Sequence, residues 1–378
     1  TGDRGPGLSN STAIIASSSP FRPFTSVQES GLILSTLGND ELTYEKKTEF
    51  NLGIDLGFLE NRINVAMDVY TRDNHDLIGT TRTQGVGGEI AKFANIASMK
   101  SHGFELSVSS NNIKTKDFSW NTDFIYSIYK NEVTDLNAIA TTMDYVSGTG
   151  FTMVGYPHRG LFSIPFAGLD SNGIPMFYNE KGEITSTDLS FQSSDDFSWL
   201  KYEGPTEPTF TGSLGNSFTY KNVHLNVFFT YSGGNVVRLD PVFSYRYSDL
   251  TATTREFKNR WMVPGDENRT NVPTILSYRQ YYENAELRNA YSAYNYSTER
   301  VAKGGFIRLK EISVAYDFPK KWLSALKVSN VSLKLQATNL CLLYADKKLN
   351  GQDPEFVNSG GVASPVPRQF TMTLRLGL

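Results

Sequence analysis

The sequence predicts an all-β fold, an antiparallel transmembrane β-barrel. From Glu41 to Leu378, runs of about ten residues alternate one apolar with one polar side chain, which is the period of a strand with two different faces. Short polar turns join these runs in pairs, while long segments join one pair to the next. Short turns at one end and long loops at the other are typical of barrels that cross a membrane.

The last run shows the alternation most clearly. Its two faces carry Phe370, Met372, Leu374, Leu376 and Leu378 on one side and Thr371, Thr373, Arg375 and Gly377 on the other. Apolar side chains opposite an arginine suit a wall that separates lipid from water. The earlier runs form hairpins of 50–58 with 63–69, 104–108 with 118–128, 210–218 with 223–231, and 312–318 with 331–337. Together with the last run, they predict about nine strands.

Aromatic residues gather at the short turns of successive hairpins. They are Phe58, Phe118, Trp120, Phe218, Tyr220, Tyr316, Phe318 and Trp322. A bilayer interface attracts such rings, whereas a secreted β-sandwich, which uses the same alternation, gives no reason for rings to collect at one end. The position of the rings therefore favours the membrane interpretation.

The composition excludes several other classes of protein. Mean hydropathy is −0.33, and no stretch approaches the roughly 18 apolar residues of a membrane helix, as expected when every second strand residue faces water. A net charge of −3 without a basic stripe argues against a nucleic-acid partner. The single cysteine, Cys341, excludes an intrachain disulfide framework and a cysteine-rich zinc site.

The long loops hold the residues with the strongest case for a functional role. Loops are predicted at 79–99, 131–206, 235–302 and 342–365, and loops of this length without a function are uncommon. Aromatic rings in them could stack on a sugar or anchor a protein lid. The candidate contact residues are Tyr145, Phe151, Tyr156, Trp199, Tyr202, Trp261, Tyr281 and Tyr282. The alternative is that these rings pack the loops against one another.

No enzyme, cofactor or metal site is predicted. The four histidines lie far apart, and none stands in an H-E-x-x-H arrangement. Gly85, Gly87 and Gly88 lack the G-x-G-x-x-G spacing of a phosphate-binding turn, so loop flexibility explains them better. Asp195 and Asp196 lack the alternating spacing and the glycine of a calcium loop, so a solvated acidic loop is favoured.

Several distinctive blocks follow one another from about Glu41 onward. They are YEKKTEFNLGID at 44–55, ENRINV at 60–65, NIASMKSHGFE at 95–105, GYP at 155–157, AGLD at 167–170, PTFTGSLGNSFTY at 208–220, WMVPG at 261–265, FIRLKEISVAYDFP at 306–319, NL at 339–340 and DPE at 353–355. In these blocks, over nearly its whole length, the chain resembles the C-terminal part of the barrel of SusC/RagA-like TonB-linked outer-membrane transporters.

The resemblance implies a nutrient importer for oligosaccharides or oligopeptides in the outer membrane of a Gram-negative bacterium. Such transporters work with a SusD-like surface lipoprotein that lids the barrel, often as a dimer of transporter–lipoprotein pairs, and with periplasmic TonB. Their barrels have about 22 strands around a plug. We therefore expect 41–378 to be the C-terminal part of the barrel and 1–40 an extracellular loop segment, with the plug, the TonB contact and the earlier strands supplied by the remaining N-terminal part.

A secreted β-rich glycan-binding module or adhesin is the alternative from a different class. A membrane wall needs detergent, whereas a secreted module stays monodisperse without it. The cargo is not indicated, because the residues expected on the inner face are mixed in charge. They are Asn51, Asp55, Asn64, Asp68, Asn226, Lys334 and Gln336.

Overall fold

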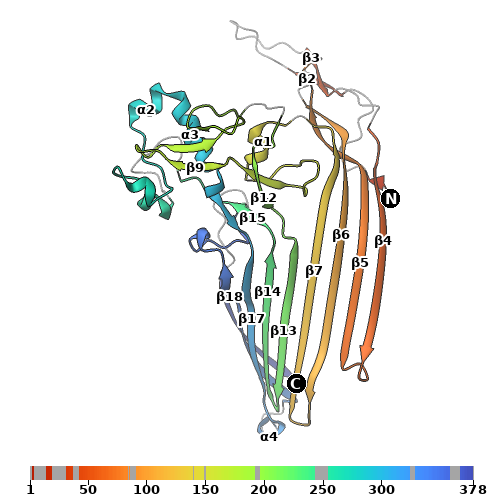
Figure 1. The fold of residues 1–378 in the computed structure, drawn as a ribbon. Helices are drawn as coiled ribbons and strands as arrows, with labels where there is room; N and C mark the ends of the chain where they lie inside the picture. Colours follow the sequence, from red (N-terminus) through yellow and green to blue (C-terminus); the bar gives the residue numbers. More distant parts are fainter. Residues whose placement is uncertain are drawn as a thin grey trace.

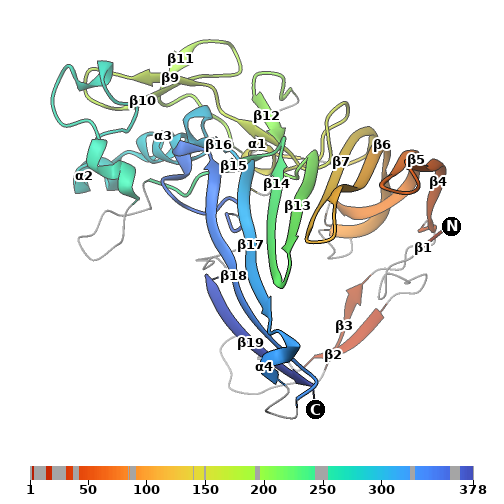
Figure 2. The ribbon, with the colours of Figure 1, turned by 90° about the horizontal axis from the view of Figure 1, so that it is seen from below.

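Nine long strands form one curved antiparallel sheet in the described part of the chain (Figure 1, Figure 2). The computed structural model describes residues 2–3, 14–18, 31–36, 42–83, 85, 91–138, 140–148, 150–191, 196–242, 254–323, 328–357 and 367–377. The long strands are, in the order in which they pair, β4 (Glu45–Phe58), β5 (Ile63–Arg82), β6 (Ala91–Lys114), β7 (Phe118–Leu136), β13 (Phe210–Tyr220), β14 (Val223–Gly233), β17 (Phe306–Asp317), β18 (Asn330–Ala345) and β19 (Gln369–Gly377). The four predicted hairpins and the ninth strand are confirmed, and the fold is a partial β-barrel.

The strand register places the predicted apolar residues on one face of the whole sheet. One row of directly paired residues runs Leu56, Val65, Val108, Phe124, Leu214, Phe229, Leu309 and Cys341. This face is open to the surroundings, since the exposed fraction is 66% at Phe50, 75% at Phe370 and 57% at Leu374. Large apolar side chains on an outward face match a wall that contacts lipid.

The predicted inner residues all fall on the opposite face. Asn226, for example, pairs with Ser217 and Ser313, and Gln336 pairs with Ser313 and Thr371. Because side chains alternate strictly along a strand, a single pairing slip would have reversed this arrangement. The register therefore confirms the two faces that the sequence predicts.

Aromatic rings mark the short-turn end of the sheet. Trp120 and Phe218 stack with ring centroids 5.7 Å apart, and Phe318 lies 5.1 Å from Tyr316 and 6.4 Å from Trp322. Trp322 is 62% exposed and belongs to the short helix α4 (Lys320–Leu323). This arrangement is that of an aromatic girdle at a membrane interface.

The strands β5, β6 and β7 extend well beyond the predicted length, so the expected loop at 79–99 is wrong. β5 continues to Arg82 and β6 begins at Ala91. With 24 residues, β6 is about 80 Å long, whereas the apolar band of such a barrel is about 25 Å tall. Beyond the membrane both faces of a strand meet water, so the alternation that reveals the strand disappears there.

The remaining helices and strands lie mainly at the end opposite the short turns (Figure 1). The strands are β8 (Gly160–Ser163), β9 (Phe166–Leu169), β10 (Pro175–Tyr178), β11 (Ile184–Thr185), β12 (Lys201–Pro205), β15 (Val236–Arg238) and β16 (Val301–Lys303). The helices are α1 (Thr142–Val146), η2 (Arg255–Asn259), η3 (Asp266–Asn268), α2 (Tyr278–Glu283), α3 (Ala285–Asn295), η4 (Thr298–Arg300) and η6 (Lys347–Leu349). We call the described residues of 140–205 and 236–303 the loop module.

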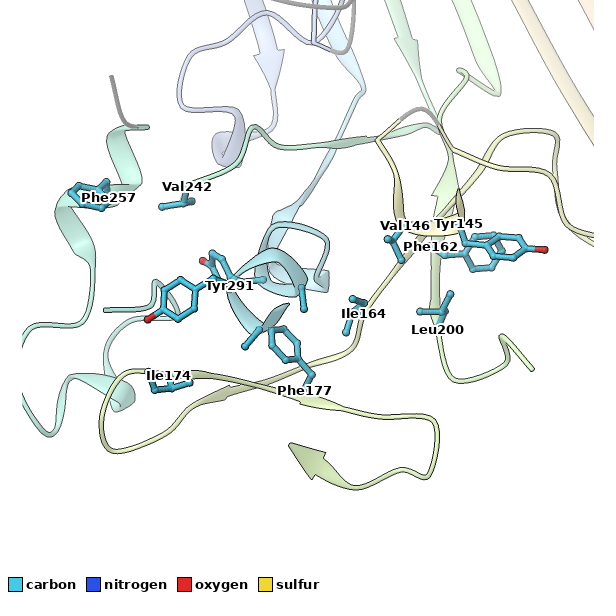
Figure 3. Close-up of a cluster of buried hydrophobic side chains, with 13 residues drawn as sticks. Tyr145, Val146, Phe162, Ile164, Ile174, Phe177, Leu200, Val242, Phe257 and Tyr291 are labelled. Atoms are coloured by element: carbon cyan, nitrogen blue, oxygen red, sulfur yellow. The ribbon is translucent and has the colours of Figure 1, made fainter. Parts of the chain in front are cut away.

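The main hydrophobic core lies in the loop module rather than in the wall (Figure 3). Its buried members are Tyr145, Val146, Phe162, Ile164, Ile174, Phe177, Leu200, Val242, Phe257, Ala290, Tyr291, Ala293 and Tyr294. These residues come from α1, β8, β10 and α3 and from the segments between them. The loop module thus has its own packed interior, which holds its surface in a defined shape.

The segment 1–40, predicted as an extracellular loop, lies mostly outside the described residues. Its described parts are β1 (Gly2–Asp3), which pairs with β4, and β2 (Ile14–Ser18), which pairs with β3 (Gly31–Thr36). None of the helices in the described ranges has the length and apolar character needed to cross a bilayer.

Candidate functional site

Tyr145 is buried in the core of the loop module. It is 6% exposed, and its ring centroid lies 5.2 Å from that of Phe151, 5.5 Å from Phe162 and 4.6 Å from Phe197. Burial raises the pKa of the Tyr145 hydroxyl. Two of the eight predicted contact residues, Tyr145 and Phe151, therefore pack against each other.

Tyr156, Tyr202 and Trp199 also pack against this core. The rings of Tyr156 and Tyr202 lie 4.8 Å apart, and each lies close to Phe162, at 5.1 and 5.3 Å. Burial raises the pKa of Tyr202 to about 12, and Trp199 is partly buried. These contacts give the rings a packing role, which is the alternative that the sequence left open. A contact with cargo or lid stays a prediction for each of them.

Trp261 braces a turn of the loop module. Its ring lies against Gly173, whose φ of +75° and lack of a Cβ allow the close approach, and its Nε1 donates a hydrogen bond of 2.9 Å to Glu267. This hydrogen bond is the main reason that the pKa of Glu267 is lowered. The next two residues, Met262 and Val263, are 60% and 58% exposed. Trp261 thus fixes a turn that presents an apolar tip.

Tyr281 and Tyr282 lie on α2 together with a third tyrosine, Tyr278. The ring centroids of Tyr278 and Tyr282 are 4.3 Å apart, and those of Tyr281 and Tyr282 are 5.2 Å apart. Tyr278 is 78% exposed and Tyr282 is 42% exposed. Of the eight predicted residues, Tyr282 therefore presents the most accessible ring, within a cluster that we call the α2 tyrosines. The sequence prediction missed Tyr278.

A polar cavity of about 470 Å³ lies in the loop module near η2, η3 and η6, and none of the eight predicted aromatic residues lines it. Its walls contain charged groups of both signs. The cations are Arg260, Arg269, Arg300 and Lys348, and the carboxylates are Glu256, Asp266 and Glu299. A site of this kind can bind a ligand that carries positive and negative charges or many polar groups.

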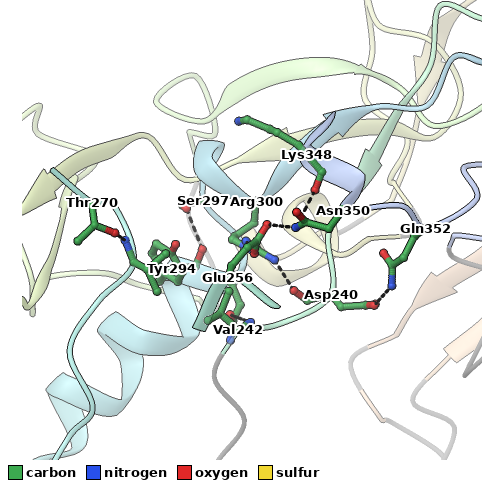
Figure 4. Close-up of polar contacts among 12 residues, drawn as sticks. Asp240, Val242, Glu256, Thr270, Tyr294, Ser297, Arg300, Lys348, Asn350 and Gln352 are labelled. Atoms are coloured by element: carbon green, nitrogen blue, oxygen red, sulfur yellow. Dashed lines mark hydrogen bonds and ion pairs between the residues drawn. The ribbon is translucent and has the colours of Figure 1, made fainter. Parts of the chain in front are cut away.

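Arg300 organises the inner wall of this cavity (Figure 4). It is 4% exposed, forms an ion pair with Glu256, and donates a hydrogen bond of 2.6 Å to the backbone oxygen of Asp240. The other carboxylate oxygen of Glu256 accepts a hydrogen bond of 2.9 Å from Asn350. Arg300 and Glu256 are 44 residues apart in sequence, so no local motif could have predicted the pair.

Two further buried arginines hold loop segments in place, Arg238 within the loop module and Arg308 against the wall. Arg238 is 6% exposed and donates hydrogen bonds to the backbone oxygens of Val146, Phe162 and Ser297 at 2.7 to 3.2 Å. Burial lowers the pKa of Arg238 to about 10, so the guanidinium keeps its charge at neutral pH.

Arg308, on β17, is the second of these arginines. It donates hydrogen bonds of 2.6 Å to both carboxylate oxygens of Asp353, and Glu355 lies 3.1 Å away. The side chains of Arg308 and Asp353 are only 6% and 8% exposed. The DPE block of the sequence is thus part of a buried ion pair that ties the segment after β18 to the wall.

The described residues offer no cluster of three or more His, Cys, Asp or Glu side chains that could hold a metal ion. Asp195, one of the two aspartates considered for calcium, lies outside the described residues, as do Gly87 and Gly88. The carboxylate of Asp196 closes a local turn. It accepts hydrogen bonds of 2.8 Å from the backbone nitrogen and from the hydroxyl of Ser198. These hydrogen bonds lower the pKa of Asp196.

Comparison with known proteins identifies relatives along most of the chain. No protein-family model matches. The chain is 26% identical over 375 residues to TonB-dependent receptor P3 of Formosa agariphila, and the match covers 93% of this chain and 34% of that protein. It is 28% identical over 372 residues to TonB-dependent receptor SusC of Bacteroides thetaiotaomicron, covering 90% of this chain and 32% of that protein. The chain thus spans about a third of the length of these curated relatives.

The fold matches a chain of the RagAB peptide transporter, with a TM-score of 0.75 and 21% identity, covering 100% of this chain and 39% of the other. The same complex in a closed-closed state gives the same TM-score. A curved sheet with an apolar outer face and a polar inner face defines the class of the protein: it is part of an outer-membrane β-barrel. The chain is a relative of the SusC/RagA-like TonB-dependent receptors, so the resemblance found in the sequence is confirmed.

Proposed function

We propose that this chain forms the wall and the loop module of a TonB-dependent outer-membrane importer of polar oligomers. The observation that carries the proposal is the two-faced sheet: nine strands in one register separate an apolar outer face from a polar inner face. Such a wall gives a polar cargo a water-lined route across lipid. The relative named TonB-dependent receptor SusC and the structural neighbour described as the RagAB peptide transporter support transport as the use of that route.

An oligopeptide is the first candidate for the cargo. The cavity beside Arg300 offers cations and carboxylates within one site, and a peptide carries charged termini and side chains of both signs. The structural neighbour RagAB is described as a peptide transporter, which agrees with this choice. An oligosaccharide is the second candidate, because the exposed α2 tyrosines provide aromatic faces on which sugar rings stack.

We further propose that a SusD-like surface lipoprotein covers the loop module and that two such pairs form a dimer. The candidate anchors for this contact are the α2 tyrosines together with Met262 and Val263, which are exposed apolar residues of the loop module. Exposed aromatic and methionine side chains are typical anchors of protein interfaces. A plug, a TonB contact and the remaining strands of the barrel are expected from the rest of the transporter.

The alternative, a secreted β-rich module or adhesin, is disfavoured by the wall. Phe50, Leu52, Phe370 and Met372 are each at least 56% exposed on the same face of the sheet. In water, an apolar surface of this kind would drive aggregation. A complete protein that stays monodisperse without detergent would reject the transporter proposal in favour of this alternative.

Uptake by cells tests the cargo proposal. We would express the complete transporter with its lipoprotein and measure the uptake of a fluorescent oligopeptide. Replacing Arg269 and Lys348 with Glu should lower uptake by about fivefold or more, as expected when one or two charge-assisted contacts of about 1 to 2 kcal/mol each are lost. Lys181→Glu is the control, since Lys181 is 70% exposed in the loop module, does not line the cavity and lies outside α2.

The second arm of this experiment uses a neutral oligosaccharide. If cells with the unmodified transporter take up the oligosaccharide and not the oligopeptide, the sugar is the cargo. If they take up the oligopeptide and the double charge reversal does not lower this uptake, the cavity beside Arg300 is not its binding site. If neither cargo enters cells that hold the folded protein and its lipoprotein, the import proposal fails.

A further inference from the structure

A groove of about 490 Å³ lies at the loop-module end of β13, β14, β17 and β18. Its principal lining residues are Phe210, Tyr231, Val236, Lys303, Ile307 and Tyr344. By the strand register, Tyr231 pairs with Ile307, which pairs with Tyr344, and all three belong to the apolar outer face. The groove therefore opens on the lipid side of the wall and is separate from the polar cavity of the loop module.

The groove lies at the height of the second membrane–water interface, the one opposite the short turns. The 11 residues of β13 run from Tyr220 in the short-turn girdle to Phe210 in the groove. They span roughly 34 Å of strand, or about 26 Å of membrane thickness at the usual tilt of about 40°. The apolar band of such a barrel is about 25 Å tall and carries an aromatic girdle at each border. Phe210, Tyr231 and Tyr344 thus belong to the second girdle, at the level of lipid headgroups.

Glycines keep the groove open. The ring of Tyr231 covers Gly212, and its hydroxyl donates a hydrogen bond of 3.0 Å to the backbone oxygen of Ile125. The ring of Phe210 covers Gly233 in the same way, so a Cβ at either glycine would overlap a ring. Both rings therefore lie flat along the wall instead of projecting into the groove.

A cation stands at the border of the groove. Lys303 is exposed and makes no ion pair within the described part of the chain. The nearby carboxylate of Asp346 instead accepts hydrogen bonds of 2.8 and 2.9 Å from the backbone nitrogens of Lys303 and Lys348. The ammonium group of Lys303 is thus available to an anionic headgroup, although Asp346 offsets part of its charge.

We propose that this groove binds a phosphorylated glycolipid of the outer leaflet, with a phosphate at Lys303 and an acyl chain along Ile307 and Tyr344. A basic residue beside an apolar groove at headgroup depth matches the two halves of such a lipid. This inference rests on the membrane location within the proposed function, and it does not depend on the cargo or on transport.

Native mass spectrometry of the complete, delipidated protein in detergent tests the proposal, with bisphosphorylated lipid A as the probe. We expect one lipid adduct, which Lys303→Glu weakens at least fivefold by opposing the phosphate. Ile307→Trp should weaken it by filling the groove, without adding a charge to the lipid face. The matched control is Lys221→Glu, because Lys221 lies in the short turn between β13 and β14, at the other end of these strands from the groove.

Two results would overturn the proposal. One is equal binding of lipid A to the Lys303→Glu and Lys221→Glu proteins, which would make the contact a non-specific one. The other is equal binding of lipid A and its dephosphorylated form to the unmodified protein, which would remove the role of the phosphate. Cargo uptake by the same variants separates the two proposals, since loss of the lipid adduct with normal uptake leaves the import function intact.

Discussion

An arginine placed at Leu335 or at Gln336 gives the sharpest test of the two faces of the wall. The two residues are neighbours on β18 and point to opposite sides. Leu335 is 52% exposed and pairs with Val314 and Met372 on the outer face. Gln336 pairs with Ser313 and Thr371 on the inner face. The same residue type, inserted one position apart, therefore meets lipid in one case and water in the other.

The expected cost follows from the depth of Leu335. β18 begins at Asn330, so Leu335 lies about 17 Å along the strand, or about 13 Å above the short-turn end at a tilt near 40°. This height is close to the middle of an apolar band about 25 Å tall, where an arginine on the lipid face costs about 2 to 4 kcal/mol. Leu335→Arg should thus lower the folding equilibrium constant roughly 30- to 900-fold, whereas Gln336→Arg should change it little.

The assay is refolding of the complete protein into lipid vesicles, followed through a urea titration, with outer-membrane fractionation of cells as a second measurement. We expect Leu335→Arg to unfold at lower urea and to reach the membrane in reduced yield. Equal midpoints and equal yields for the two variants would refute the assignment of the faces, because the paired neighbours of Leu335 on the outer face, Val314 and Met372, are apolar.

Three further predictions follow from particular contacts. Val227→Arg should lower the urea midpoint and impair assembly as Leu335→Arg does, because Val227 lies on the same outer face, paired with Asn216 and Ile312, while Asn226→Arg should assemble nearly normally. Asp353→Ala should cost less than the about 3 to 5 kcal/mol of an unpaired buried charge, because Glu355, 3.1 Å from Arg308, still compensates part of its charge. The loss should appear as faster proteolysis after β18, whereas Glu283→Ala, at an exposed pair with Arg279, should change little. Burial lowers the pKa of His158 from 6.5, so the unfolded chain binds the proton before the folded one does. The segment around His158 should therefore lose stability as the pH falls from about 6.5 towards the lowered pKa. Hydrogen exchange at pH 7.5 and 5.5 should show this change, and His158→Asn should remove it.

Lipid and water impose a period of two on the wall, and that period made the strands and their faces predictable. The pattern runs from Phe50 to Gly377 without depending on any single contact. It fails at 79–99, where both faces of β5 and β6 meet water. The polar cavity was beyond prediction for a different reason: Glu256, Arg300 and Lys348 come together only through the packing of the loop module.

The predicted aromatic contact residues illustrate the same limit of sequence reasoning. Composition identified the rings, but only the core of the loop module separates Tyr145, which is buried, from Tyr282, which is 42% exposed. A loop sequence without a period does not tell which side of a ring is covered. The exposed α2 tyrosines are therefore the residues to change when the lid proposal is tested.

Removal of residues 235–302 would be a poor test of that lid proposal, because this segment supplies α3 and much of the core around Tyr294. Its loss would expose the rest of the loop module and could abolish lipoprotein binding for reasons unrelated to contact. Point changes at the surface avoid this problem. Replacing Tyr278 and Tyr282 with Glu places two charges on the proposed interface while leaving the core untouched.

We expect this double variant to lose most of the co-purifying lipoprotein, since aromatic anchors commonly contribute 2 kcal/mol or more to binding, about 30-fold each. The barrel should remain in the outer membrane, because the changes lie far from the wall. Tyr178→Glu is the matched control: Tyr178 is also 42% exposed in the loop module, but it lies on β10 and not on α2. Undiminished pull-down of the lipoprotein by the double variant, or equal loss in the control, would show that the lid rests elsewhere on the loop module.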